Sequence, residues 1–203
     1  MFYLIKTPWW LKMLYRRCIW EMPRGSKTIY LTFDDGPHPE VTPFVLEQLR
    51  KHGAKATFFC IGKNVEAYPD VYQRIISEGH SVGNHTQNHL NGWSNGDDVY
   101  LENIRQAATH ISSSLFRPPY GRIRLSQLRK MSGYKVIMWS VLSGDFDISI
   151  DGARCLTNVL RYTGDGSVVV FHDSEKAAVR MRYALPEVLE TFSGKGFRFD
   201  AII

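Results

Sequence analysis

The chain has 203 residues, of which 44% are hydrophobic and 22% charged, values that are ordinary for one soluble globular domain with its own core. Three cysteines, Cys18, Cys60 and Cys155, are odd in number and far apart, which argues against a disulfide framework and against a cysteine-held metal site. The formal net charge of +5 would indicate a polyanionic partner if it were spread over the whole chain.

The excess positive charge lies entirely in residues 1–27. This segment holds six basic residues and one acidic residue, whereas residues 28–203 hold 19 of each sign. The remainder of the chain is therefore neutral, and we expect no nucleic-acid partner. The charged residues of the segment are Lys6, Lys12, Arg16, Arg17, Glu21, Arg24 and Lys27.

Residues 7–20 are rich in tryptophan and leucine, and their pattern predicts a short helix with Thr7 as its N-cap and Pro8 in its first turn. The segment is too short to span a bilayer, and no small-residue cleavage site of a secretory signal follows it. Two alternatives stay open: a helix packed over one end of the domain, or a peripheral membrane anchor whose tryptophans and basic residues lie at headgroup level. We expect a cytoplasmic or membrane-associated protein.

From residue 28 onward, β-prone runs alternate with segments of helical periodicity, and glycines stand where the helices should end. This alternation predicts an α/β fold with a mostly parallel sheet. About seven repeats could build either an open doubly wound sheet or a closed, irregular barrel. The predicted strands are 28–33, 56–61, 81–84, 115–117, 135–142, 167–171 and 197–202. The predicted helices are 41–51, 71–79, 97–113, 126–132, 151–162 and 177–192.

Two neighbouring aspartates, Asp34 and Asp35, directly follow the first predicted strand, and two histidines, His85 and His89, follow the third. Catalytic groups of parallel α/β folds collect at this end of the strands. One carboxylate and two imidazoles make a three-ligand metal site with open positions, and the second aspartate is then free to move a proton. The residue types accept zinc, cobalt, nickel or iron. The pattern predicts a metal-assisted hydrolase.

Five segments, taken in order, resemble the motifs of the polysaccharide deacetylases, the NodB-homology group of carbohydrate esterase family 4. The resemblance runs from about residue 28 to the end of the chain and implies a distorted, irregular (β/α) barrel of about seven parallel strands. It divides the chain into a basic, aromatic arm, 1–27, and a catalytic domain, 28–203. The segments are Thr32-Phe33-Asp34-Asp35-Gly36-Pro37, His85-Thr86-Gln87-Asn88-His89, Arg117-Pro118-Pro119-Tyr120-Gly121, Ser143-Gly144-Asp145-Phe146 and Val169-Val170-Phe171-His172-Asp173.

The resemblance implies a role for each aspartate. Asp34 would be the general base that activates a metal-bound water, and Arg117 would pair with it and favour its ionised form. Asp35, His85 and His89 would hold one divalent metal ion, for which we expect zinc, with cobalt or nickel as alternatives.

The remaining implied roles concern the oxyanion and the leaving group. The backbone N–H of Tyr120 would stabilise the oxyanion together with the metal, and His172 would protonate the departing amine. Asp145 would orient the imidazole of His172 and favour its protonated, charged form. Asp147 and Asp151 lie nearby in the sequence, and either could serve instead.

Three aromatic residues are candidates for contact with a sugar: Tyr120, Phe146 and Trp139. Family members often carry tryptophan at the position of Phe146, so this chain keeps an aromatic wall there without an indole N–H. Trp93 is a further candidate stacking surface, and each of Trp139, Trp93 and Tyr120 could equally be a packing residue.

The resemblance implies a metal-dependent hydrolase that removes N-acetyl groups from the amino sugars of a polysaccharide or oligosaccharide and releases acetate. Peptidoglycan, chitin-like oligomers, poly-N-acetylglucosamine and O-acetylated xylan lie within the family's range. The alternatives are a deacylase or deformylase of a lipid-linked sugar, to which the arm would be suited, and a non-catalytic glycan-binding protein of the same fold. A metal phosphoesterase is disfavoured, since one carboxylate ligand suits a single metal ion. We expect a monomer with a carbohydrate substrate.

Overall fold

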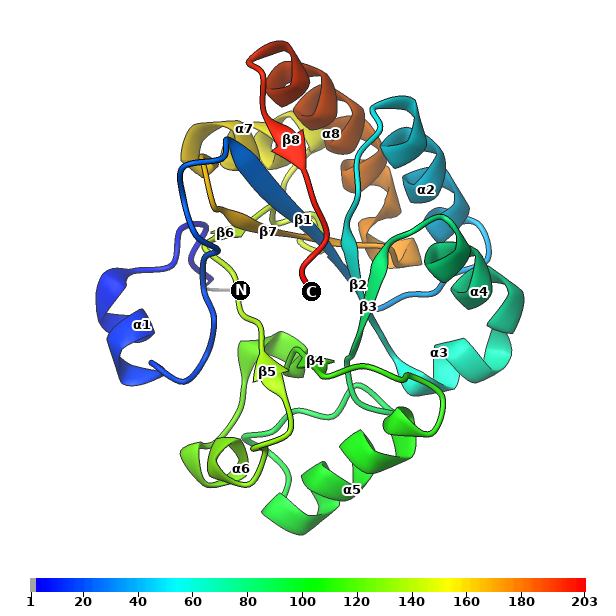
Figure 1. The fold of residues 1–203 in the computed structure, drawn as a ribbon, viewed down its shortest axis with the longest axis vertical. Helices are drawn as coiled ribbons and strands as arrows, with labels where there is room; N and C mark the ends of the chain where they lie inside the picture. The colour runs from blue at the N-terminus through cyan, green and yellow to red at the C-terminus, as the bar shows by residue number, and fades with distance from the viewer. Residues whose placement is uncertain (1–2) are drawn as a thin grey trace.

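A curled parallel sheet organises residues 3–203, the part of the chain that this computed structural model describes (Figure 1). The strand order is β5-β4-β3-β2-β1-β7-β6, with β8 beside β1, and each strand pair is parallel. The predicted distorted barrel is confirmed. The strands are β1 (Thr28–Asp34), β2 (Thr57–Cys60), β3 (Ser81–Asn84), β4 (Leu115–Phe116), β5 (Lys135–Val136), β6 (Val141–Leu142), β7 (Val168–His172) and β8 (Arg198–Phe199).

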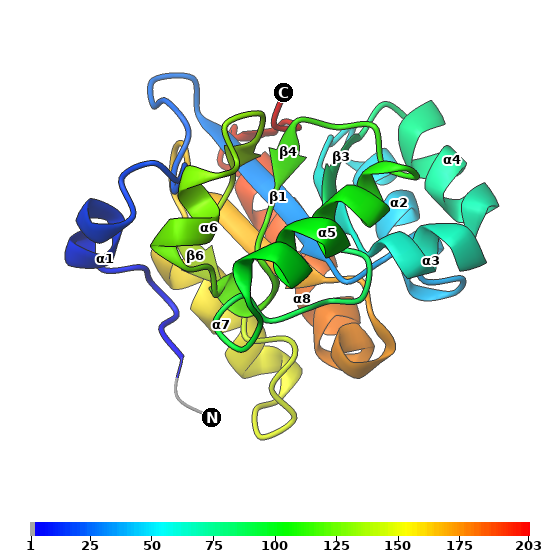
Figure 2. The same ribbon diagram turned by 90° about the horizontal axis from the view of Figure 1, so that it is seen from below.

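Helices surround the sheet, and α2 and α8 pack against its outer face (Figures 1 and 2). The helices of the described chain are α1 (Trp9–Leu14), α2 (Val41–Lys51), α3 (Gly62–Ala67), α4 (Pro69–Ser77), α5 (Asp97–Ala108), α6 (Leu125–Arg129), α7 (Gly152–Tyr162) and α8 (Glu175–Gly194), with a 3-10 turn at Pro119–Gly121. None of them, within residues 3–203, combines the length and the apolar character needed to cross a bilayer.

The central strand β1 divides its side chains between two environments. Ile29, Leu31 and Phe33 belong to the main core beneath the helices, and Phe33 stacks on the ring of Phe58 in β2 at 5.1 Å. Because successive side chains of a strand point to opposite faces, Thr32 and the terminal Asp34 point to the inside of the barrel. The alternation of side chains along β1 therefore points the Asp34 carboxylate into the barrel. Asp34 lies at the carboxyl end of β1, where the neighbouring parallel strands also end.

After residue 28, the largest differences from the predicted elements concern one strand and one helix. The expected strand 135–142 is broken into β5 and β6, which form opposite edges of the sheet, so the residues between them cross the barrel's opening. The expected helix 97–113 ends at Ala108, because the serine run that follows favours a loop: the Ser113 hydroxyl donates to the backbone oxygen of Val82 and accepts the N–H of Leu115. Helix α3 was not predicted.

The N-terminal arm hydrogen-bonds to both edges of the sheet. The N–H of Ile19 donates to the oxygen of Val136 at 2.8 Å beside β5, and the N–H of Leu142 in β6 donates to the oxygen of Ile5 at 2.8 Å. The arm thus lies along the opening between β5 and β6, while α1 projects away from the wall in both views (Figures 1 and 2). Residues 1 and 2, which the predicted arm includes, lie outside the described residues.

The predicted N-cap of the arm is wrong. The residue before α1 is Pro8, whereas Thr7 is buried and its hydroxyl donates to the backbone oxygen of Trp139 at 2.7 Å. The hydroxyl is used to attach the arm to the barrel. The helix is also shorter than the predicted 7–20, because Cys18 and Trp20 turn inward and pack in a core cluster.

Candidate functional site

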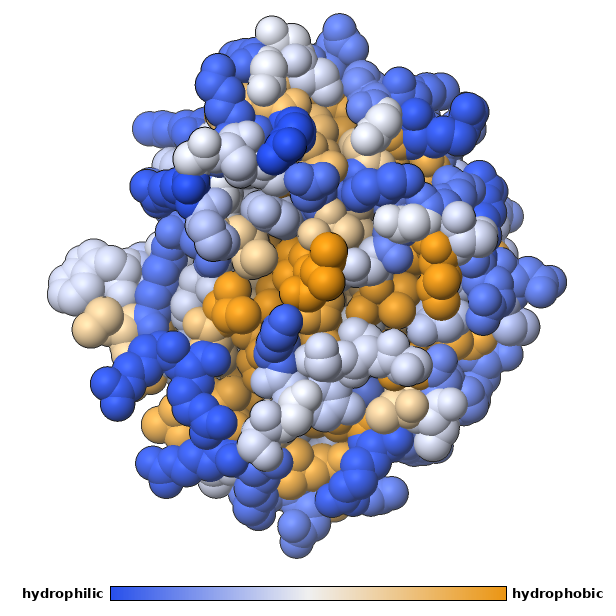
Figure 3. All heavy atoms as spheres, in the orientation of Figure 1, coloured by the Kyte–Doolittle hydropathy of each residue, from blue (hydrophilic) through white to orange (hydrophobic). Residues whose placement is uncertain are grey.

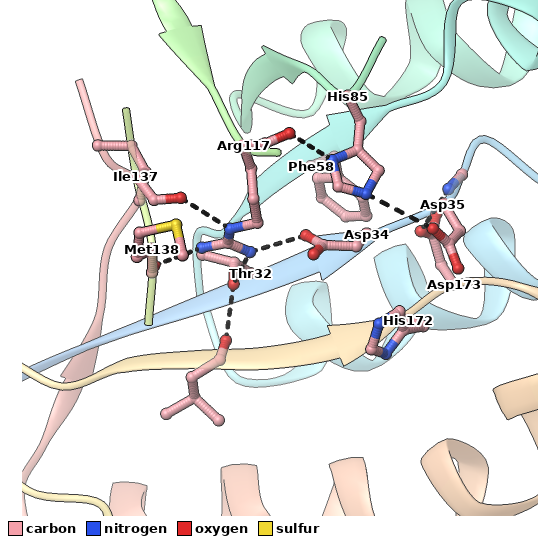
Figure 4. Close-up of polar contacts among 12 residues, drawn as sticks. Thr32, Asp34, Asp35, Phe58, His85, Arg117, Ile137, Met138, His172 and Asp173 are labelled. Atoms are coloured by element: carbon pink, nitrogen blue, oxygen red, sulfur yellow. Dashed lines mark hydrogen bonds and ion pairs between the residues drawn. The ribbon is translucent and has the colours of Figure 1, made fainter. Parts of the chain in front are cut away.

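The predicted site residues lie at or just after the carboxyl ends of the barrel strands. Asp34 and His172 end β1 and β7 and are register partners, while His85, Arg117 and Asp145 follow β3, β4 and β6. Because the strands are parallel, their carboxyl ends meet at the same edge. Figure 4 shows Asp34, His85 and His172 grouped there.

Asp35, His85 and His89 converge on one point. One ligand atom from each lies within 4.8 Å of the others, and Asp35 Oδ1 is 3.6 Å from His85 Nε2 and 3.1 Å from His89 Nε2. This carboxylate oxygen is buried and has no hydrogen-bond partner among the described residues. A carboxylate oxygen and two imidazole nitrogens are a donor set that suits a divalent first-row metal ion, so these three residues could hold one.

The orientation of His85 leaves one ring nitrogen available. Its Nδ1 lies 2.7 Å from the backbone oxygen of Arg117, a pure acceptor, so Nδ1 carries the proton and Nε2 presents a lone pair toward Asp35 (Figure 4). Burial lowers the pKa of His85 to about 4, which keeps the imidazole neutral. A neutral imidazole oriented by its other nitrogen is the form that binds metals.

The backbone around this group is strained. Asp35, Thr86, His89 and Tyr120 all adopt the left-handed region, with φ between 57° and 78°. Asn84 holds one of these turns, because its Oδ1 accepts the N–H of Thr86 at 2.8 Å. Non-glycine residues in this region cost free energy and gather at functional sites. The strain at this edge therefore indicates a functional geometry independently of the side chains.

Arg117 is fully buried inside the barrel and pairs with Asp34. Its Nη1 donates to Asp34 Oδ1 at 2.7 Å and to the Thr32 hydroxyl at 2.7 Å. The rest of the guanidinium donates to the backbone oxygens of Ile137 and Met138 at 3.1 and 2.9 Å. The buried positive charge is thus hydrogen-bonded on several sides, and Asp34 is the carboxylate that balances it.

His172 forms a second buried pair with Asp145. Asp145 Oδ1 lies 2.7 Å from His172 Nδ1, and its Oδ2 accepts the backbone N–H of the same histidine at 2.7 Å. Burial lowers the pKa of His172, but the charge and hydrogen bond of Asp145, with the charges of Asp35 and Asp34, outweigh that effect and raise it to about 10. The imidazole is therefore charged at neutral pH, with Nε2 on the side of the ring away from Asp145.

The two other acids near this position have different partners. Asp147 accepts the Tyr3 hydroxyl at 2.7 Å, and Asp151 accepts the N–H of Arg154 at 2.7 Å as the N-cap of α7. Of the three acids that the sequence left open, Asp145 is the one that contacts His172.

The aromatic candidates fall into two environments. Tyr120 is 55% exposed with its ring 4.5 Å from that of His89, and Phe146 meets the ring of His172 edge-on at 5.3 Å. Both rings therefore border the site. Trp139 is half-buried and packs against two core clusters. Contact of these residues with a sugar stays a prediction.

Asp173 is a site residue that sequence reasoning did not assign. It is fully buried, and its carboxylate accepts the N–H of Gly36 at 3.0 Å and the hydroxyl of Thr42. Burial, together with the charge of Asp35, raises its pKa to about 7. These bonds attach the turn after Asp35 to the end of β7. A Cβ at residue 36 would overlap the Asp173 carboxylate, so the glycine of the first motif was a signal for this contact.

Comparison with known proteins gives a family match. The sequence profile of the polysaccharide deacetylases matches residues 21–137. A peptidoglycan-N-acetylglucosamine deacetylase of Bacillus cereus is 36% identical over 192 residues, which cover 90% of each chain. A chitooligosaccharide deacetylase of Azorhizobium caulinodans is 35% identical over 160 residues, which cover 74% of this chain and 75% of that protein.

A solved structure extends the match to the fold. A peptidoglycan N-acetylglucosamine deacetylase, crystallised with 4-naphthalen-1-yl-N-oxidanyl-benzamide, superposes with a TM-score of 0.88 at 31% identity. The superposition covers 97% of this chain and 95% of that one, so it includes both the barrel and the N-terminal arm.

Proposed function

The chain belongs to the polysaccharide deacetylase family, and on that basis we propose that it is a metal-dependent hydrolase that removes N-acetyl groups from the amino sugars of a glycan and releases acetate. Residues 28–203 would be the catalytic domain, with residues 1–27 as its arm. The observation that carries the proposal is the placement of two charged pairs, Asp34 with Arg117 and His172 with Asp145, beside a group that could hold a metal.

Hydrolysis of an amide needs an activated nucleophile and a stabilised oxyanion. A divalent ion held by Asp35, His85 and His89, for which we propose zinc with cobalt or nickel as alternatives, would act as a Lewis acid toward the acetyl carbonyl and a water molecule. Asp34 accepts the proton of the attacking water, and the 2.7 Å hydrogen bond from Arg117 fixes the orientation of its carboxylate for this purpose.

Departure of the amine needs a proton and a stabilised carbonyl oxygen. His172 is charged at neutral pH and donates its Nε2 proton to the sugar nitrogen as the C–N bond breaks. We assign the backbone N–H of Tyr120 as the donor to the oxygen of the former carbonyl. The products are acetate and a free amino sugar.

The relatives favour an N-acetylglucosamine residue as the substrate, because both peptidoglycan and chitooligosaccharides contain it. The test is acetate release from peptidoglycan, chito-oligosaccharides, poly-N-acetylglucosamine and O-acetylated xylan. We expect acetate from at least one of the three N-acetylated glycans, with peptidoglycan first. Acetate from xylan alone would contradict N-deacetylation, and carbohydrate binding without acetate release would favour a non-catalytic protein.

Replacing Asp145 by asparagine should move the alkaline limb of the pH–rate profile to lower pH. His172 acts as an acid only while protonated, so activity falls as the pH rises through its pKa. Asparagine removes the negative charge that raises this pKa and leaves the burial that lowers it. The measurement is kcat/KM for acetate release against pH in the wild type and in Asp145→Asn.

Asp147→Asn is the matched control for this experiment. It removes a carboxylate two residues away that bonds to Tyr3 and Ser149 instead of His172. Its alkaline limb should stay where the wild type has it. If Asp147→Asn moves the limb and Asp145→Asn does not, the assignment of Asp145 is wrong.

A further inference from the structure

Helix α1 carries four large apolar side chains on its solvent side. Trp9, Trp10, Met13 and Leu14 are 76%, 53%, 66% and 58% exposed. In Figures 1 and 2 the helix projects from the barrel wall, and in Figure 3 its pale to tan side chains stand at the left edge beside dark blue ones. Contiguous apolar surface of this kind marks an interaction site.

The four side chains form one continuous face of the helix. At 3.6 residues per turn, positions 9, 10, 13 and 14 fall within an arc of about 140°. Leu11 lies outside this arc and packs against a core cluster. One apolar side chain of the helix therefore packs against the protein, and the other four are exposed to solvent.

Hydrogen bonds on both sides of α1 hold this face in place. Before the helix, the N–H of Thr7 donates to the oxygen of Ser140 at 3.0 Å. After it, the N–H of Met138 donates to the oxygen of Ile19 at 2.7 Å. The exposed face is thus a projection fixed at both ends and not a fraying terminus.

Basic residues flank α1 on both sides in the sequence. Lys6, Arg16 and Arg17 are exposed, and within residues 3–203 none of them takes part in an ion pair. The only acid of the arm, Glu21, is paired with Lys12 at 2.6 Å. Because the rest of the chain is neutral, the protein's net charge of +5 lies in the arm that carries this helix.

We propose that α1 docks the protein on an anionic lipid bilayer. Trp9 and Trp10 would lie at the headgroup level, Met13 and Leu14 would enter the acyl boundary, and the neighbouring arginines would meet the lipid phosphates. A second copy of the chain is a poorer occupant of the face, because a two-fold contact would place two basic arms opposite each other.

The test is flotation of the full chain with vesicles of phosphatidylcholine alone and of phosphatidylcholine mixed with phosphatidylglycerol. We expect binding to the anionic vesicles that weakens as salt rises. Arg16→Gln with Arg17→Gln should weaken that binding by about 30-fold, which corresponds to about 1 kcal/mol for each basic residue. Trp9→Ser with Trp10→Ser should weaken it by roughly tenfold or more.

Two control variants match the test variants in exposure and charge. Val179→Ser changes a residue that is 76% exposed in α8, and Arg50→Gln with Lys51→Gln removes two charges at the end of α2. Both should bind vesicles like the wild type, and all variants should keep the wild-type circular dichroism and unfolding midpoint. Absence of vesicle binding would overturn the proposal. So would equal losses in the α1 and control variants, or a dimer that the tryptophan substitutions dissociate.

Discussion

Replacing Asp34 by asparagine is expected to lower kcat/KM for acetate release by about 10²- to 10⁴-fold. The amide oxygen can still accept the hydrogen bond from Arg117, which spans 2.7 Å in the wild type. An amide cannot accept the proton of the attacking water, however, so the loss falls on the chemical step. Steady-state acetate release over substrate concentrations from below to above KM gives both kcat and kcat/KM.

The neighbouring aspartate provides a matched control. Asp35→Asn should abolish metal binding as well as activity, since Asp35 belongs to the converging group and Asp34 does not. Asp34→Asn should therefore bind one equivalent of zinc by calorimetry while remaining inactive. The opposite result, in which Asp34→Asn loses the metal and Asp35→Asn keeps it, would make Asp34 the metal ligand and contradict both assigned roles.

Replacing Arg117 by methionine is expected to lower the free energy of unfolding by about 3–5 kcal/mol. The guanidinium is fully buried, and its removal leaves the buried Asp34 carboxylate without its counter-charge. Two backbone oxygens, of Ile137 and Met138, also lose their donor. Urea unfolding of the two proteins measures the difference.

An exposed arginine provides the control for this measurement. Arg105→Met removes a guanidinium that pairs with Glu102 on the surface of α5, where an ion pair contributes little. A loss at Arg117 no larger than the loss at Arg105 would mean that the buried pair does not stabilise the barrel. Introducing Asp34→Leu together with Arg117→Met should recover part of the lost stability, because no buried charge then remains unbalanced.

Local sequence patterns were sufficient to predict individual strands and the residues that lie at their carboxyl ends. The apolar run before Asp34 predicted β1, and the rule that parallel strands end at one edge predicted that Asp35 would lie near His85 and His89. The confirmed barrel, by contrast, came from the resemblance, because alternating strands and helices fit an open sheet equally well.

Features that depend on contacts distant in the sequence could not be predicted. Nothing local separates Asp145 from Asp147, and only the contact with His172 distinguishes them. The break between β5 and β6 and the misassigned Thr7 have a common cause, since both depend on how the arm lies along the barrel's opening. A sequence pattern carries no information on that pairing.

The most direct test of the central claim is a zinc titration of the chelator-treated protein, monitored by acetate release from an N-acetylglucosamine glycan. If Asp35, His85 and His89 hold the ion that the reaction needs, the stripped protein is inactive and its activity returns in proportion up to one equivalent of zinc. His85→Ala, treated in the same way, should not recover. Full acetate release by the stripped wild-type protein would contradict the account.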